Sequence, residues 1–386
     1  MRKTFLLLPA LALGFSLFMI ADGWVAFGKA AAGDRLQRMQ NSPNWRDGTF
    51  VNGLALYNPF LDSPERWFDS SDHAKPAREP VSTQAREGAF DKPVPLRITW
   101  FGHSIALIEL GAVRFLTDPV WSDRVSPFNW LGPRRWYAPP MALDALPAID
   151  AVLISHDHYD HLDTATIQAL NGRVGQFVVP LGVGAHLEYW GIPAEQIVEL
   201  DWWEETSIAG VCVTATPARH ASGRVLIDND RTLWMGFALR SAERSVYFSG
   251  DTGLFPELQD IGNRLGPFDA TLIEVGAYGV DWPDWHIGPE QAVLAHDWVR
   301  GGVLLPVHWG LFDLARHAWT EPIERTLVAA HAAGYRVVTP RPGAPVDFDA
   351  DLTDEKWWPE VPWQNAAEAP IVATGAFDRS LRSSAP

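Results

Sequence analysis

The stretch ISHDHYDHLD, residues 154–163, begins at the end of the apolar run AVLIS. A short apolar run bounded by polar residues is typical of a buried strand, so the polar cluster lies where that strand ends. Asp163 precedes the pattern TATIQAL, where it is expected to cap a helix. The candidate metal ligands of this stretch are His156, His158, Asp160 and His161. Imidazole and carboxylate groups are the usual ligands of zinc and related metals, so the H-x-H-x-D-H spacing favours a metal site over a solvated polar loop.

Three polar residues further along the chain share this context. His220 lies in TPARH after VCVTAT, Asp251 in SGDTG after SVYFSG, and His308 in PVHWG after VLLPV. A lone histidine is more often a packed residue than a ligand. Each of these residues, however, follows a strand-like run, so all three can project from one edge of a sheet and complete the first cluster.

Length and composition limit the classes of protein that fit. The chain has 386 residues, 47% of them hydrophobic, which is enough for one large core or two modest ones. The net charge of −16 disfavours polyanions and argues against nucleic acid as a partner. The single cysteine, Cys212, excludes an intrachain disulfide and a multi-cysteine metal site. The 19 tryptophans fit either ordinary packing or an aromatic groove or membrane-facing belt.

The N-terminus has the pattern of an export segment. Arg2 and Lys3 precede an uncharged run over residues 5–21, and this run of 17 residues lies between a typical signal core and a full membrane span. Residues 1–32 are therefore predicted to be a signal peptide or an N-terminal membrane anchor. Two candidate cleavage sites follow, at Ala21/Gly23 and at Ala30/Ala32. Either outcome places the rest of the chain outside the cytoplasm, periplasmic or anchored facing the periplasm.

The remaining chain divides by pattern into an irregular extension over 33–94, one domain over 95–342 and a C-terminal tail over 343–386. The strand-like runs in the domain are LRITWF, IALIEL, VRFLTD, AVLIS, QFVVP, VCVTAT, TLWMGFAL, SVYFSG, ATLIEV and VLLPVH. Gly111 and Ala112 suit a two-residue hairpin turn. Helices are expected over 289–299 and Glu321–Ala333, with Gly334 ending the second. Mixed elements with an antiparallel start predict an α+β, or layered α/β, fold.

The H-x-H-x-D-H loop, followed in order by TPARH, SGDTG and PVHWG, resembles the metallo-β-lactamase superfamily. WFGHS, FLTDPVWSDRVSP, GPRR, ELDWWEE and GAY are similar to its N-acylphosphatidylethanolamine-hydrolysing phospholipase D branch, over residues 44–341. The resemblance implies a four-layer αβ/βα sandwich with two metal ions at one edge. Ligation by nitrogen and oxygen suits two Zn²⁺ best, and Fe or Mn also fit.

The resemblance also implies roles for individual residues. One metal ion would be held by His156, His158 and His220, and the other by Asp160, His161 and His308, with Asp251 bridging. His286, in DWHIGPEQA, matches a histidine near the substrate phosphate, although a surface histidine before a helix explains it equally well. His103 and Tyr278 match motif positions and are expected to line the substrate pocket. The predicted catalytic residues are Asp160, Asp251 and His286.

The predicted chemistry is hydrolysis by water. Two metal ions about 3.5–4 Å apart ionise a water held between them and polarise the target oxygen. No GxSxG nucleophile elbow occurs, so direct attack is favoured over a covalent intermediate. The expected substrate is an N-acyl phosphatidylethanolamine or a related phospholipid at a membrane surface, cleaved at its phosphodiester. The alternatives are a lactonase, a phosphodiesterase with a soluble substrate, or a non-catalytic envelope protein that retains the metal site. The oligomeric state stays open, a homodimer included.

Overall fold

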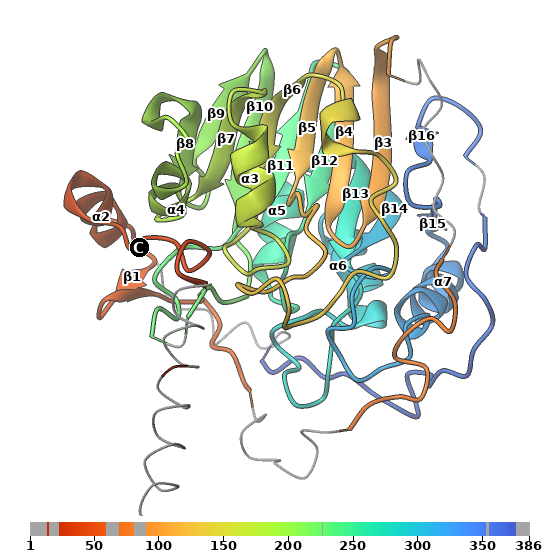
Figure 1. Cartoon of the computed structure of the whole chain (residues 1–386). Helices are drawn as coiled ribbons and strands as arrows, with labels where there is room; N and C mark the ends of the chain where they lie inside the picture. The colour runs from red at the N-terminus through yellow and green to blue at the C-terminus, as the bar shows by residue number, and fades with distance from the viewer. Residues whose placement is uncertain are drawn as a thin grey trace, which may run out of the picture.

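Two seven-stranded β-sheets pack against each other at the centre of the molecule, and helices cover both outer faces (Figure 1). This computed structural model describes residue 14 and residues 23–58, 69–80, 90–225, 227–352 and 355–375. The arrangement is the predicted layered α/β fold, with the four layers helix, sheet, sheet and helix.

The first sheet has the strand order β16-β3-β4-β5-β6-β7-β8. Its strands are β3 (Val94–Gly102), β4 (Ile105–Gly111), β5 (Val113–Thr117), β6 (Ile149–Leu153), β7 (Val174–Pro180), β8 (Ile197–Leu200) and β16 (Pro345–Asp347). β3, β4 and β5 are antiparallel neighbours, whereas β5 to β8 run parallel. The predicted hairpin turn is confirmed, because Leu110 pairs with Val113 across Gly111 and Ala112.

The second sheet repeats this plan with the order β15-β14-β13-β12-β11-β10-β9. Its strands are β9 (Glu205–Ile208), β10 (Val211–Thr216), β11 (Gly236–Arg240), β12 (Ser245–Phe248), β13 (Phe268–Glu274), β14 (Gly301–Val307) and β15 (Arg336–Val337). β9 to β12 are antiparallel neighbours and β12 to β15 run parallel. Both sheets therefore begin antiparallel and end parallel.

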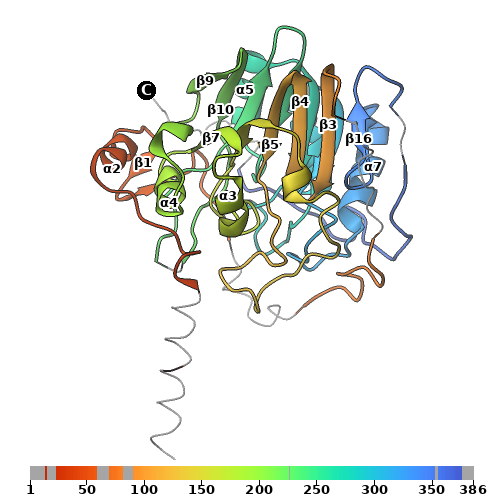
Figure 2. The ribbon, with the colours of Figure 1, turned by 45° about the horizontal axis from the view of Figure 1, so that its top comes forward.

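Helices lie on the outer faces of the sandwich. α3 (Thr164–Leu170) and α4 (Gly184–Tyr189) cover the first sheet (Figure 2), and α5 (Glu257–Leu265), α6 (Pro289–Trp298) and α7 (Glu321–Ala333) cover the second. The predicted caps are confirmed: the Asp163 carboxylate accepts a hydrogen bond from the Ala165 N–H, and Gly334 ends α7 in the left-handed conformation. α2 (Gly33–Gln40) and the short hairpin of β1 (Trp45–Arg46) and β2 (Thr49–Phe50) lie beside α4. Two single turns of 3₁₀-helix, η3 (Leu143–Ala145) and η4 (Ala194–Gln196), complete the described elements.

Alternation along the strands of the first sheet places side chains in two of the three hydrophobic clusters formed by the described residues. In β4, Ile108 and Leu110 point into the core between the sheets, whereas Leu107 points toward α3 and α4. In β7, Val178 likewise points into the core between the sheets and Phe177 toward the helices. Successive strand residues face opposite sides of a sheet, so strands buried on both faces read as continuous apolar runs. This burial explains why the strands were predictable from the sequence.

The described residues beyond 343, which are 344–352 and 355–375, include parts of the packed structure. β16 pairs with β3, and Trp358 is buried with its indole N–H donating to Glu324. Ring contacts join six tryptophans into one cluster, Trp100, Trp136, Trp309, Trp319, Trp357 and Trp358. Packing in this cluster therefore accounts for six of the 19 tryptophans.

The predicted signal peptide or anchor lies mostly outside the described residues, since only Gly14 of the apolar run is among them. Within the described ranges, no helix is long and apolar enough to span a membrane.

Candidate metal centre

Strand direction gathers the polar residues at one edge of the sandwich. In the first sheet, β3, β5 and β6 run the same way, because β4 is antiparallel to both of its neighbours. In the second sheet, β10, β12, β13 and β14 likewise share one direction. Six residues and one loop lie at or just beyond the carboxyl ends of these strands. The loop follows β6, and the residues are His103, Asp118, His220, Asp251, Glu274 and His308.

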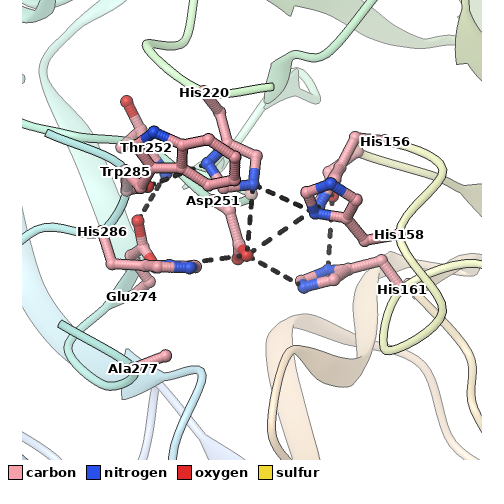
Figure 3. Close-up of polar contacts among 12 residues, drawn as sticks. His156, His158, His161, His220, Asp251, Thr252, Glu274, Ala277, Trp285 and His286 are labelled. Atoms are coloured by element: carbon pink, nitrogen blue, oxygen red, sulfur yellow. Dashed lines mark hydrogen bonds and ion pairs between the residues drawn. The ribbon is translucent and has the colours of Figure 1, made fainter. Parts of the chain in front are cut away.

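His156, His158 and His220 form the first group of converging nitrogens (Figure 3). His156 Nε2 lies 2.9 Å from His158 Nδ1, which in turn lies 3.3 Å from His220 Nε2. The His220 ring is oriented by the carbonyl of Trp285, 2.8 Å from Nδ1. The predicted trio from two different sheets is therefore brought together.

Asp160, His161 and His308 form the second group, with Asp251 between the two. The Asp160 Oδ2 atom lies 3.4 Å from His161 Nε2 and 3.5 Å from His308 Nε2. Asp251 Oδ2 lies 3.1 Å from each of these two nitrogens. Its distances to His156 Nε2 and His220 Nε2 are 3.9 and 3.8 Å, so this one carboxylate oxygen borders both groups (Figure 3).

The donor set fits divalent cations. Nitrogen ligands 2.0–2.1 Å from a tetrahedral ion lie about 3.3–3.4 Å apart, close to the separations within each group. Among the described residues, His161 Nε2, His308 Nε2 and Asp251 Oδ1 are buried and make no hydrogen bond of acceptable geometry. Buried polar atoms are rarely left without a partner, so this cluster has the form of a site for cations.

The charges in the cluster depend on one another. Burial alone would raise the pKa of Asp251, but His161 and His308 outweigh it and hold this pKa well below its usual range. Burial alone would lower the pKa of His308, but Asp251 and Asp160 raise it to about 10. The carboxylates thus attract positive charge to the cluster, and a metal ion must displace protons to bind there.

Asp118, at the end of β5, contacts the ligand-bearing loop that follows β6, residues 154–163, which is called the metal loop below. Its carboxylate lies 2.8 Å from His161 Nδ1 and accepts hydrogen bonds from the Ser155 N–H and hydroxyl, at 2.7 and 2.6 Å. The carboxylate fixes the His161 ring with Nε2 turned toward Asp251 and Asp160. Such outer hydrogen bonds orient metal-binding histidines and raise their basicity.

His103 and His308 join the two sheets at the site. The His308 N–H donates to the His103 carbonyl at 2.9 Å, and the His103 N–H donates to the Trp309 carbonyl at 3.0 Å. Both histidines have a positive φ, 52° for His103 and 63° for His308, which is unfavourable for residues with a Cβ. Strain of this kind persists only where the surrounding structure enforces it, and it is concentrated at functional sites.

The three residues that were expected to contact substrate lie in different surroundings. Burial lowers the pKa of His103 to about 3, so the ring is neutral, and its Nε2 lies 3.1 Å from Asp160 Oδ2. His286 Nδ1 lies 2.8 Å from Glu274 Oε2 and 3.7 Å from Asp251 Oδ2. Tyr278 is buried, and its hydroxyl donates to Glu321 at 2.7 Å.

The sequence did not single out Asp118, Ser155 or Glu274. Glu274 is fully buried and lies within 3.6 Å of His308 Nδ1 as well as beside His286. A signal was present, since Asp118 and Glu274 also stand at the ends of strand-like runs, as Asp251 does. An acidic residue at a strand end is common, however, and its partners are not visible in the sequence.

Residues 113–309 match the family model of the beta-lactamase superfamily domain. An uncharacterized protein of Mycobacterium tuberculosis is 46% identical over 343 residues, covering 86% of this chain and 91% of that protein. The N-acyl-phosphatidylethanolamine-hydrolyzing phospholipase D 1 of Caenorhabditis elegans is 39% identical over 229 residues, 56% of this chain and 64% of that protein. The solved structure of Igni18, a metallo hydrolase from Ignicoccus hospitalis, has 25% sequence identity and a TM-score of 0.52, covering 65% of this chain and 97% of that one.

Replacing Asp118 by Asn is expected to weaken metal binding by about 10- to 100-fold, because His161 loses the carboxylate that orients it. The measurement is competition with a chelator. Asp123→Ala serves as the control, since this carboxylate is exposed and pairs with Arg134 at the surface. Equal metal affinity of the Asp118→Asn variant and the unaltered protein would contradict the role assigned to Asp118.

Proposed function

Because the chain belongs to the metallo-β-lactamase superfamily of metal-dependent hydrolases, we propose that it is a dinuclear, zinc-dependent phosphodiesterase of the phospholipase D type. In the reaction, water attacks the phosphorus of an N-acyl phosphatidylethanolamine or a related phospholipid. The bond to the N-acyl ethanolamine oxygen breaks, and phosphatidic acid remains. The observation that carries the proposal is the His286–Glu274 pair beside Asp251 (Figure 3).

The seven clustered side chains would hold two Zn²⁺ ions, with Asp251 shared between them. When bound, such ions would lower the pKa of a coordinated water and would neutralise negative charge on the phosphate oxygens. Asp251 and Asp160 keep the site negative enough to attract two cations.

His286 is placed to handle the leaving group. Its Nδ1 is committed to the buried carboxylate of Glu274, which fixes the ring and leaves Nε2 as the nitrogen for a substrate. The Glu274 carboxylate is itself held by the backbone N–H of Thr252, the residue after Asp251. When protonated, Nε2 can donate to the departing alkoxide oxygen, a role typical of histidine.

A partly apolar cavity favours a lipid substrate over a small soluble one in this proposal. This cavity has a volume of about 540 Å³ and is lined in part by Asp157, which stands between the predicted ligands His156 and His158 in the sequence, whereas the predicted ligands themselves do not line it. Its lining combines apolar residues, among them Phe27, Leu36, Met39 and Ile227, with polar ones such as Lys29 and Arg231. An acyl chain gains about 0.8 kcal/mol for each buried CH₂ group, so a cavity of this kind can contribute much of the binding energy.

Two metal equivalents per chain are expected, because the ligands form two groups that share Asp251. Asp251→Ala should reduce occupancy of both sites, whereas His308→Ala should mainly empty one. Elemental analysis of the purified protein measures both effects, with His331→Ala, an exposed histidine of α7, as the control. Active unaltered protein that contains one ion or none would rule out the dinuclear proposal.

His286→Ala is expected to lower the turnover of N-acyl phosphatidylethanolamine by about 10²- to 10⁴-fold and to leave the metal content unchanged. Shortening the acyl chains should lower kcat/KM stepwise, because less apolar surface is buried. Rates are compared on bilayer lipid and on a water-soluble phosphodiester, again with His331→Ala as the control. Equal rates on both substrates, or activity on a lactone alone, would disprove the lipid substrate and leave the hydrolase class standing.

The predicted export of the chain also enters as a proposal, with the catalytic domain periplasmic or at the outer face of a membrane. It is supported by Arg2, Lys3 and the apolar run over residues 5–21. A reporter that works only outside the cytoplasm, fused after Pro386 so that β16 and Trp358 stay intact, should be active. Removing residues 1–22 should silence the fusion. A fusion that stays silent with these residues present would refute the proposed location.

A further inference from the structure

Residues 25–29, the clamp segment, use their backbone to hold three buried side chains of the main domain. The Val25 carbonyl accepts from the Trp190 indole N–H at 2.7 Å. The Ala26 carbonyl accepts from Arg224 Nε at 2.7 Å. The Lys29 N–H donates to His186 Nδ1 at 2.9 Å. These partners lie 157 to 198 residues away in the sequence.

Arg224 connects the clamp segment to two positions in the metal loop. Its Nη1 donates to the carbonyl of Asp157 at 2.6 Å and to that of Leu162 at 2.9 Å. The guanidinium lies over the ring of Tyr159, 4.2 Å from its centre. The loop between Asp157 and Leu162 carries three of the predicted metal ligands, so one buried cation fixes the shape of that loop.

His186 connects the clamp segment to the side chain of Asp157. Since the Lys29 N–H occupies Nδ1, the ring proton of neutral His186 is on Nε2, which faces Asp157 Oδ2 at 3.4 Å. Asp157 also accepts from the Gly223 N–H and the Thr232 hydroxyl, both at 2.7 Å. Asp157 stands between His156 and His158, so its orientation fixes the backbone from which these two rings project.

We infer that residues 25–29 position the loop between Asp157 and Leu162, and that metal binding by His156 and by the ligands of this loop, His158, Asp160 and His161, depends on the docking of residues 25–29. Arg224 and His186 are positioning residues that transmit this dependence through Asp157. The inference concerns metal binding alone and does not rest on the substrate of the proposed function.

Gly28 gives a sharp test in the full-length chain. It has φ +78°, and a Cβ at this position would lie 2.1 Å from His186 Nδ1. Gly28→Ala must therefore displace either His186 or the clamp segment. Gly33→Ala is the matched control, because Gly33 also has a positive φ, +58°, yet a Cβ there meets nothing within 4 Å.

Gly28→Ala is expected to weaken metal affinity about tenfold in chelator competition, as losses of supporting hydrogen bonds around metal ligands do. It should also change the visible absorption of Co²⁺ bound in place of the native metal. Gly33→Ala should leave both unchanged. His186→Phe provides a second variant, since it keeps a ring against Trp190 but loses both hydrogen bonds, and it should weaken metal affinity similarly.

Unaltered metal affinity and Co²⁺ spectrum in folded Gly28→Ala and His186→Phe proteins would overturn the inference. A lower thermal midpoint alone, with normal metal affinity, would do the same, because it would show that the segment contributes only to packing.

The site of N-terminal processing gives an independent check. Cleavage at Ala21/Gly23 retains the clamp segment, whereas cleavage at Ala30/Ala32 removes it. A mature protein that starts after Ala30 or Ala32, by intact mass, and binds metal normally would equally refute the inference.

Discussion

Five histidine nitrogens lie 3.1 to 3.9 Å from a single oxygen, Asp251 Oδ2, in a buried position. Polar groups that are buried together in this way lose their hydrogen bonds to water, and their contacts with one another compensate only part of that loss. The arrangement is therefore stable only around positive charge. The rest of the fold follows from this requirement. Parallel strand ends bring the side chains to one edge, and each of the two sheets, which pack together through a shared apolar core, supplies part of the cluster.

Packing holds the strained backbone at this edge. His308 and His103 have unfavourable positive φ values. The His308 N–H donates to the His103 carbonyl, and the His103 N–H donates to the Trp309 carbonyl, so these bonds join the two sheets. Trp309 stacks on Trp100 at 5.4 Å, and the Trp100 indole N–H donates to the His103 carbonyl at 2.7 Å. Trp357 and Trp358, from the C-terminal segment, contact Trp309 and complete the same cluster. Aromatic rings bury large areas, so this cluster can offset the strain that the histidines need.

The sequence predicted the parts of the site that are local in the chain. His156, His158, Asp160 and His161 are recognisable from spacing, and Asp251 and His308 from their place after buried strands. Strands buried on both faces gave apolar runs, so β3 to β7 and β10 to β14 could be found. The sequence did not reveal that Arg224 binds the carbonyl of Asp157, 67 residues away, because any residue type offers a carbonyl. β16 was missed for a similar reason, since its register is set by β3 and not by its own short Pro- and Asp-rich segment.

In the proposed reaction, electrostatic and hydrophobic interactions between the protein and its substrate act over different distances. The chain carries a net charge of −16, so it repels an anionic phosphodiester at long range. Physiological salt screens charges beyond about 8 Å, which confines the attraction of bound cations to the interior of the site. The first contact with a lipid must then come from apolar surface. Trp24 and Ile227, exposed by 59% and 87%, lie on the lining of the partly apolar cavity that Asp157 also lines. A soluble phosphodiester has no apolar tail that could bind to this surface. In this proposal the negative charge of the protein would therefore weaken the binding of a soluble phosphodiester more than the binding of a lipid.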